Sequence, residues 1–234
     1  MSDNLKLDKI LFLDIETAPL VYNYSDLPIE SKLLWDKKWA FNESESAEQR
    51  YKKAGIYAEF AKVVCISMGN FYNGKFYIKS ISSTDEKEIL TQFSEHLNKF
   101  YNSDEHNLCA HNGKEFDFPF LCRRFLINRI NLPKILSISG KKPWEVKLLD
   151  TMEHWKFGDY KNYTSLNLLA HVFNLPSPKD EIDGSDVARV FWEEKNLEKI
   201  AKYCSKDVVT LASIFCILNG KDAVTNEQVV LANL

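Results

Sequence analysis

Two acidic residues, Asp14 and Glu16, stand two positions apart in an otherwise apolar segment, KILFLDIET. In an extended strand, residues two apart project from the same face, so both carboxylates could contact one divalent cation. A D-x-E pair is common by chance, and acids at a strand end are more often solvated than catalytic. The apolar neighbours favour a functional interpretation here, because carboxylates inside a domain are costly without a partner.

Three further residues could join this pair. Asp117 precedes Pro119, which suits the first turn of a helix because it has no N–H to leave unpaired. Tyr203 and Asp207 fall one turn apart on one flank of an apolar helical stripe that begins at Leu197, so they can reach the same point. Each residue also has an ordinary interpretation. Asp117 could be a helix cap, Tyr203 a half-buried aromatic and Asp207 an exposed helix residue.

The four acids suit phosphodiester hydrolysis. That reaction must neutralise charge on the scissile phosphate, activate water and stabilise the leaving 3′ oxygen, and two Mg²⁺ or Mn²⁺ ions about 4 Å apart can do all three. The segments that carry the acids resemble, in order, the three exonuclease motifs of the DEDD superfamily: LFLDIETAP, HNGKEFDFPFL and YCSKDVVTL. The Y-x-x-x-D spacing of the third segment, with no histidine in that window, resembles the DEDDy branch.

Other stretches extend the resemblance over almost the whole chain. They are YKKAGIYAEFAKVVCIS, DTMEHWKFGD and IDGSDVARVFWEE, which are similar to the family of predicted 3′-to-5′ exonucleases related to the proofreading domain of family-B DNA polymerases. The resemblance implies an α/β fold with a ribonuclease-H-like mixed sheet flanked by helices. We expect one exonuclease domain over residues 1–234.

The resemblance also assigns roles to the candidate residues. Asp14, Glu16 and Asp207 would lie near one metal ion, Asp14 would lie near both, and Asp117 would act on the second. The cofactors would be two divalent cations, Mg²⁺ or Mn²⁺. Tyr203 would orient the attacking water by hydrogen bonding, because a tyrosine with an ordinary pKa of about 10 is a poor base at neutral pH.

Two residues of the second motif, Asn112 and Phe116, could contact the terminal base or sugar, although Asn112 also fits a turn. Asp150 is interpreted as structural, and Asp183 as a loop or cap residue. The expected activity is removal of nucleoside monophosphates from the 3′ end of single-stranded or frayed DNA. The alternatives are an RNA exonuclease of the same mechanism and a catalytically silent module that binds nucleic-acid ends. A separate polymerase is a candidate partner.

The overall charge fits an enzyme better than a binding module. The net charge of −3 and the pI of about 6.0 argue against a protein that coats nucleic acid through a broad basic surface. An enzyme that grips only a strand end can rely on cations and a few lysines, and Lys114, Lys161 and Lys179 are candidates for phosphate contacts. A solvated lysine is the ordinary interpretation of each.

Cysteine usage and hydropathy indicate the compartment. The chain has five cysteines and no C-x-x-C pair, so a disulfide framework is not expected. Zinc binding by the nearby residues His106, Cys109 and His111 is disfavoured, because a short strand would scatter those side chains over both faces.

No apolar run approaches the roughly 20 residues of a membrane span. Acids interrupt the first apolar stretch, which does not read as a secretory signal. We expect a cytoplasmic protein.

Several elements should position the acids. Alternation over KILFLDIET predicts a strand, and two β-rich runs joined by Asn73-Gly74 predict a hairpin over 63–82. Ser83 with Glu86 suggests a capping box ahead of a helix whose apolar stripe ends at Phe100. A short strand over 108–110 should lead to the helix at Asp117. Helices are also expected over 165–175 and near 185–194, and a last one runs from Leu197 to Gly220. The stretch 19–61 is expected to be an excursion with partial helix.

Overall fold

The computed structural model describes residues 6–40, 45–159, 163–177 and 182–232. Its centre is a six-stranded mixed sheet with the strand order β5-β4-β1-β2-β3-β6. Strand β1 is antiparallel to β2 and parallel to β4, and the outer strands β5 and β6 run parallel to their neighbours. The strand bounds are β1 Ile10–Pro19, β2 Ala61–Tyr72, β3 Lys75–Ser82, β4 Asn107–Ala110, β5 Leu148–Asp150 and β6 Val229–Leu231.

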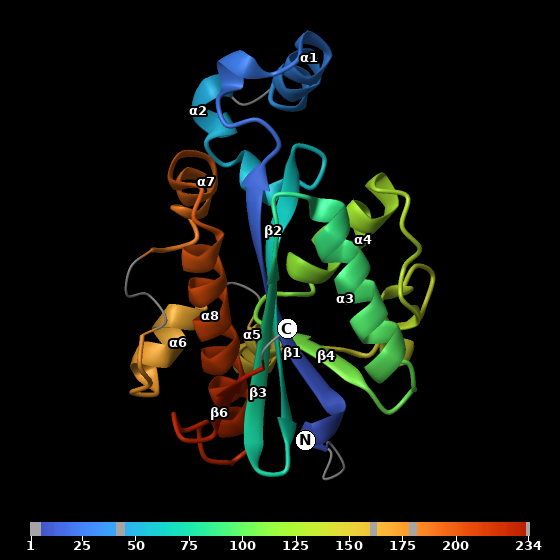
Figure 1. Cartoon of the computed structure of the whole chain (residues 1–234), viewed down its shortest axis with the longest axis vertical. Coiled ribbons are helices and arrows are strands. Elements are labelled where there is room, and N and C mark those ends of the chain that lie inside the picture. The colour runs from blue at the N-terminus through green and yellow to red at the C-terminus, as the bar shows by residue number, and fades with distance from the viewer. Residues whose placement is uncertain (1–5, 41–44, 160–162, 178–181, 233–234) are drawn as a thin grey trace.

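Helices cover both faces of this sheet (Figure 1). Helices α3 and α4 pack on one face, and the long helix α8 crosses the other face with α5, α6 and α7 beside it. The helix bounds are α1 Ile29–Lys38, α2 Ala47–Tyr51, α3 Glu86–Phe100, α4 Asp117–Ile127, α5 Thr151–Lys156, α6 Leu166–Val172, α7 Val187–Arg189 and α8 Leu197–Leu218. The α/β mixed sheet expected from the sequence is confirmed.

Strand β1 lies inside the protein with both of its faces covered. Leu11, Leu13 and Ile15 belong to the apolar cluster under α3 and α4, whereas Phe12 belongs to the cluster under α8. This division follows from the strand period of two, which sends alternate side chains to opposite faces. Asp14 shares the parity of Phe12, so the same rule directs it toward α8.

The hairpin of β2 and β3 forms as predicted. Tyr72 and Lys75 close the pair around Asn73 and Gly74, whose φ angles are 47° and 75°. Two consecutive positive φ angles give a turn whose twist matches the flanking strands, and asparagine and glycine tolerate them best. Strands β2 and β3 are therefore paired by a local turn, whereas β1 and β4 reach the sheet centre from distant segments of sequence.

Helix α3 buries most of its predicted stripe but begins differently. Its N-cap is Asp85, whose side chain accepts a hydrogen bond from the Lys87 amide. The capping box predicted for Ser83 and Glu86 is therefore wrong, because Glu86 is turned inward to the buried Arg124. Phe100 is also not part of the buried stripe. It is the last residue of the helix and is 51% exposed.

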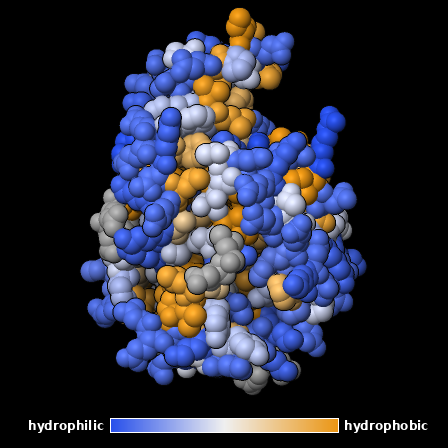
Figure 2. Space-filling view, viewed as in Figure 1, coloured by the Kyte–Doolittle hydropathy of each residue, from blue (hydrophilic) through white to orange (hydrophobic). Residues whose placement is uncertain are grey.

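The excursion between β1 and β2 forms a small lobe around one tryptophan. Trp35 of α1 is fully buried, donates a hydrogen bond to the Ala47 carbonyl, and is surrounded by aromatic rings of the same stretch. The outer side of α1 instead exposes three apolar residues, Ile29, Leu33 and Leu34. Figure 2 shows apolar residues at this end of the molecule. The partial helix expected here is confirmed.

Helices α6, α7 and α8 match their predicted positions closely, whereas α5 was not predicted from the sequence. Ser165 caps α6, and α7 continues into a turn of π-helix over Val190–Glu194. Helix α8 ends before Gly220, which has a φ of 69°. Among the described residues, no helix is long and apolar enough to cross a membrane.

Candidate active site

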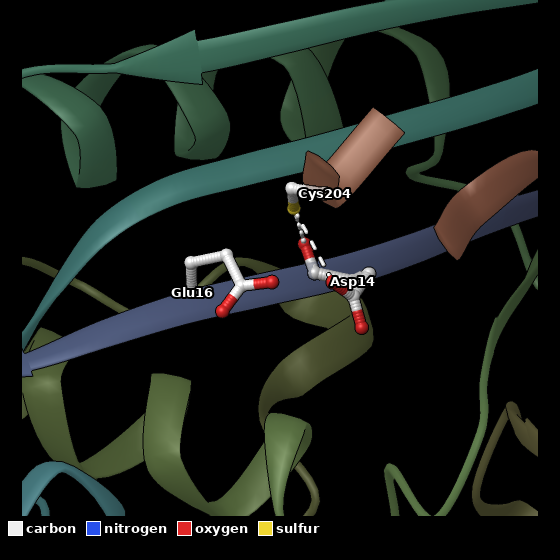
Figure 3. Close-up of side chains that lie close together, drawn as sticks. All are labelled: Asp14, Glu16 and Cys204. Carbon is white, nitrogen blue, oxygen red and sulfur yellow. Dashed lines mark hydrogen bonds between the residues drawn. The ribbon is translucent and has the colours of Figure 1, made fainter. Parts of the chain in front are cut away.

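Strand β1 and helix α8 bring three potential ligand groups together at the centre of the sheet. The ligand atoms of Asp14, Glu16 and Cys204 all lie within 4.8 Å of one another (Figure 3). The Cys204 thiol donates to Asp14 Oδ2 at 3.3 Å and also lies 3.4 Å from the Asp14 carbonyl oxygen. A break in the β1–β2 register follows directly after Glu16. Such irregularities re-aim the side chains beside them.

Asp117 is the first residue of α4, as predicted, and it faces the same region. Burial raises its pKa to about 7. Hydrogen bonds from its own amide and from Ile15 oppose this rise, whereas the charges of Asp150 and Asp207 add to it. The Ile15 contact ties the start of α4 to β1 between Asp14 and Glu16.

Burial and mutual repulsion also act on the β1 acids. Burial raises the pKa of Asp14 well above its ordinary value, and the charges of Asp207 and Asp117 raise it further. The pKa of Glu16 is raised by burial and then by Asp14 and Asp207. All four predicted acids therefore interact electrostatically, although Asp117 and Asp207 are not members of the tight group of ligand atoms.

Helix α8 contributes Tyr203 and Asp207 one turn apart, as the spacing predicted. Both are nearly buried, and the Tyr203 hydroxyl is hydrogen-bonded to Asp207. Burial raises the pKa of Tyr203 far above its ordinary value, and the charges of Asp207, Glu16 and Asp14 act in the same direction. The hydroxyl therefore stays protonated at neutral pH and can donate a hydrogen bond.

The loop before α4 is organised by Asp150. Its carboxylate accepts from the backbone amides of Asn112 at 2.9 Å and Lys114 at 3.0 Å, and it caps α5 through the Met152 amide. The structural interpretation of Asp150 is thus confirmed. Asn112 has a φ of 59°, and its buried Oδ1 has no hydrogen-bond partner among the described residues. Phe116 is half-buried and packs against the core beside Phe120.

The secondary candidates are less central. Lys114 pairs with Glu153 at 2.6 Å rather than projecting alone, and Asp183 accepts hydrogen bonds within its own loop, as expected of a loop residue. Lys161 and Lys179 lie outside the described residues. The zinc ligand set that was disfavoured from the sequence does not assemble, since His111 is occupied by Thr151 and Thr164.

Two residues near the acids were missed by sequence reasoning. Cys204 is a small apolar residue within the apolar stripe of α8, and nothing in that pattern indicates that its thiol contacts Asp14. Tyr163 is 66% exposed as a residue, and partial desolvation of its hydroxyl, followed by the nearby charge of Asp117, raises its pKa. No local pattern around Tyr163 indicates that it lies near Asp117.

The chemistry of the cluster fits a divalent cation. Asp14, Glu16 and Asp117 are carboxylates with raised pKa values, and no lysine or arginine in the described ranges forms a salt bridge with them. A hard cation bound by these oxygens would supply the missing positive charge. The site can therefore hold a metal ion at the centre of the sheet.

Comparisons with known proteins match most of the chain to one family. A family model described as a predicted 3′–5′ exonuclease related to the exonuclease domain of PolB matches residues 56–229, which include Asp117, Tyr203 and Asp207. The chain is 25% identical over 144 residues to a DNA polymerase of Pyrococcus glycovorans; the match covers 56% of this chain and 18% of that polymerase.

A solved structure supports the fold independently. The family B DNA polymerase of the hyperthermophilic archaeon Pyrobaculum calidifontis matches 87% of this chain with a TM-score of 0.54 and 15% identity. The chain covers 24% of that polymerase, so it spans about a quarter of the length or less of both relatives. The ribonuclease-H-like arrangement of a mixed sheet flanked by helices is thereby confirmed.

Proposed function

Since the chain belongs to the family of predicted 3′–5′ exonucleases related to the exonuclease domain of PolB, we propose that it hydrolyses phosphodiester bonds at nucleic-acid 3′ ends. The proposed substrate is the 3′ end of single-stranded or frayed DNA, and the products are nucleoside monophosphates. DNA is favoured over RNA because both relatives are DNA polymerases.

One observation carries this proposal. Carboxylates from three separate elements, β1, α4 and α8, converge in one region, where Glu16, Asp117 and Asp207 are buried and Asp14 is half-buried. Burying several like charges together is unfavourable unless a cation compensates them. A structural role alone does not account for that arrangement, because apolar residues would fill the same space at lower cost.

The residues that would hold the cations follow from their positions. Asp14, Glu16 and Asp207 would hold one Mg²⁺ or Mn²⁺ ion, and Asp14 with Asp117 would hold the second. Bound ions of this kind would neutralise the scissile phosphate, activate water and stabilise the leaving 3′ oxygen. The protein supplies fixed carboxylates on rigid elements, which lowers the cost of reorganising them during the reaction.

Tyr203 would position the attacking water rather than deprotonate it. Its hydroxyl keeps its proton and donates a hydrogen bond to Asp207, which fixes the direction of the ring, so its oxygen lone pairs would accept a hydrogen bond from the water. Asn112 and Phe116 are the proposed contacts to the terminal nucleotide. The unpartnered Oδ1 of Asn112 would accept a hydrogen bond from the base or sugar.

A cleavage assay tests the proposal directly. A 5′-labelled single-stranded DNA incubated with Mn²⁺ or Mg²⁺ should shorten one nucleotide at a time from its 3′ end. Asp14→Ala and Asp207→Ala should each reduce the rate by about a thousandfold, as expected when a metal site is lost. Asp222→Ala is the matched control, because Asp222 is an exposed acid that follows the end of α8 and is not one of the four acids of the site.

Two outcomes would count against the proposal. Intact DNA and RNA after incubation with both metals would exclude the exonuclease activity and leave the silent end-binding module. Faster shortening of a matched RNA strand would retain the reaction and reverse the proposed substrate preference. Duplex and mismatched duplex substrates in the same assay would report whether the strand end must be frayed.

Three further inferences concern the domain organisation, the partner and the compartment of the protein. We infer that residues 1–234 act as one exonuclease domain, that a separate polymerase is its partner, and that it works in the cytoplasm. The five cysteines are free, which fits a reducing compartment. Co-purification of a tagged chain with a polymerase from the cytoplasmic fraction tests the partner and the compartment, and recovery of the chain elsewhere would reject the compartment.

A further inference from the structure

Helix α8 places a thiol directly against the first acid of the site. Cys204 is fully buried, and its Sγ lies 3.3 Å from Asp14 Oδ2 (Figure 3). The two residues are 190 positions apart in the chain, so the contact exists only because α8 packs on β1. The same thiol lies 3.4 Å from the Asp14 carbonyl oxygen.

This contact has a defined direction. A carboxylate accepts hydrogen bonds and a thiol can donate one, although weakly. The neighbouring Cys65, which pairs with Glu16 across the β1–β2 ladder, is a second possible partner for the thiol. An ionised carboxylate is the stronger acceptor of the two, because charge-assisted hydrogen bonds are shorter and stronger than neutral ones.

A donor on Oδ2 limits how the Asp14 carboxylate can rotate. With one lone pair of Oδ2 engaged by the thiol, the second lone pair of Oδ2 and both lone pairs of Oδ1 are left to bind cations. Metal sites commonly depend on such outer contacts, which fix the orientation of a ligand without touching the metal.

We propose that Cys204 is a positioning residue that orients the Asp14 carboxylate for divalent-cation binding through an S–H···O hydrogen bond. The inference rests on the proposed function, because it needs cations at the acidic cluster. Direct coordination by sulfur is the competing arrangement. It is less suited to Mg²⁺ and Mn²⁺, which prefer oxygen ligands.

Calorimetric titration with Mn²⁺ alone tests the assignment, with binding rather than catalysis as the readout. Cys204→Ala should weaken Mn²⁺ binding by about tenfold or more, the usual effect of removing an outer contact to a metal ligand. Cys204→Ser keeps a donor of similar reach and should restore most of the affinity. Cys216→Ala is the matched control, since Cys216 is a buried thiol of the same helix and its nearby charge is Lys221 rather than an acid.

The outcomes separate this inference from the proposed function. Mn²⁺ binding that is equal in wild-type protein and Cys204→Ala overturns the positioning role but leaves the metal site. Absence of Mn²⁺ binding by the wild-type protein overturns the proposed function and the positioning role with it. Equal losses in the alanine and serine variants, or a thiolate-to-metal absorption band with Cd²⁺, would assign sulfur as a direct ligand and reject the hydrogen-bond role.

Folding must be checked for each variant by circular dichroism and thermal unfolding. If the alanine variant does not fold, Cys204→Val removes the donor while filling the space, and the same tenfold loss is expected of it. A simple packing role would change the melting temperature of these variants and leave their Mn²⁺ affinity at the wild-type value, which would reject the positioning role.

Discussion

At the scale of single residues, the site depends on what burial does to charge. Asp14, Glu16 and Asp117 are held where their charged forms are disfavoured, and their pKa values rise accordingly. Tyr203 lies in the same environment, but its neutral form is the useful one because it retains a proton to donate. One environment therefore disfavours the charged carboxylates, which a bound cation would stabilise, and keeps the tyrosine protonated.

Replacement of Tyr203 by phenylalanine isolates that donor. Tyr203→Phe keeps the ring and removes the hydroxyl that bonds Asp207. We expect the rate of DNA shortening at saturating substrate to fall by about tenfold to a hundredfold, because the water loses its positioning group while the acids remain. Mn²⁺ affinity measured by calorimetry should change little. A large loss of Mn²⁺ affinity together with activity would instead make Tyr203 part of the metal site.

At the scale of elements, a buried ion pair joins the helices that cover one face of the sheet. Glu86 of α3 accepts from Arg124 of α4 at 2.5 Å and also from the Val63 amide of β2 at 2.8 Å. Arg124 in turn donates to the Ala58 carbonyl at 2.7 Å. These bonds connect α3, α4 and β2, and α4 begins with Asp117, so the pair helps to place a member of the site.

Removing one partner of this pair should be costly. Glu86→Ala leaves the Arg124 guanidinium buried without its carboxylate, and we expect the free energy of unfolding to fall by about 3–5 kcal/mol. Urea unfolding measures this loss. The double variant Glu86→Leu with Arg124→Met should recover much of it, because no uncompensated charge is left. A double variant as unstable as Glu86→Ala would indicate that the individual hydrogen bonds matter more than the charge.

Helix α3 also carries a pH-sensitive residue. Burial, with Lys79 and Lys99 nearby, lowers the pKa of His96 to about 4. A histidine whose pKa is depressed on folding stabilises the protein above its unfolded pKa of about 6.5, and that stability is lost as the pH falls toward 4. His96 packs at a tilt against the rings of Phe100 and Tyr101, which a phenylalanine could also do.

His96→Phe should therefore reduce the loss of stability in acid. Between pH 7 and pH 4.5 we expect the wild-type protein to lose about 1–2 kcal/mol more of its unfolding free energy than the variant. Urea unfolding at the two pH values provides the comparison, and effects of the other titrating groups cancel between the two proteins. Parallel losses in both would show that His96 is as easily protonated folded as unfolded.

At the scale of the whole molecule, the sheet gathers distant segments into one centre. Strand β1 comes from the start of the chain, α4 from its middle and α8 from near its end, and all three meet beside Asp14. Cations bound there would link these elements, so the stability of the whole fold should depend on metal.

Divalent cations should consequently raise the melting temperature. At a Mn²⁺ concentration one hundred times the dissociation constant, binding adds about 2.7 kcal/mol, or roughly 5–10 °C for a chain of this size. Addition of a chelator should reverse the shift, and Asp14→Asn should abolish it. The variant should also unfold at a higher temperature than wild type in chelator, because one buried repelling charge has been removed. A shift of equal size in the variant would place the cations elsewhere.

Local patterns in the sequence determined much of this protein. Alternation around Asp14 and Glu16 indicated their strand, Asn73-Gly74 indicated the hairpin, and the spacing of Tyr203 and Asp207 indicated their shared helix flank. Each of these features depends on the side-chain periodicity of a strand or helix, or on turn geometry. Both involve only a few neighbouring residues, so the local sequence predicts them.

Only the tertiary structure decided the features that depend on residues far apart in the chain. The contact of Cys204 with Asp14 arises from the packing of α8 on β1. A cysteine in an apolar stripe gives the same sequence pattern whether its thiol faces an acid or a leucine. Glu86 turned to Arg124 instead of completing a capping box, because a buried guanidinium competes more strongly than a helix N-terminus. The three-residue edge strands β5 and β6 were likewise not foreseen, since so short a segment carries no period and becomes a strand only when a neighbouring strand pairs with it.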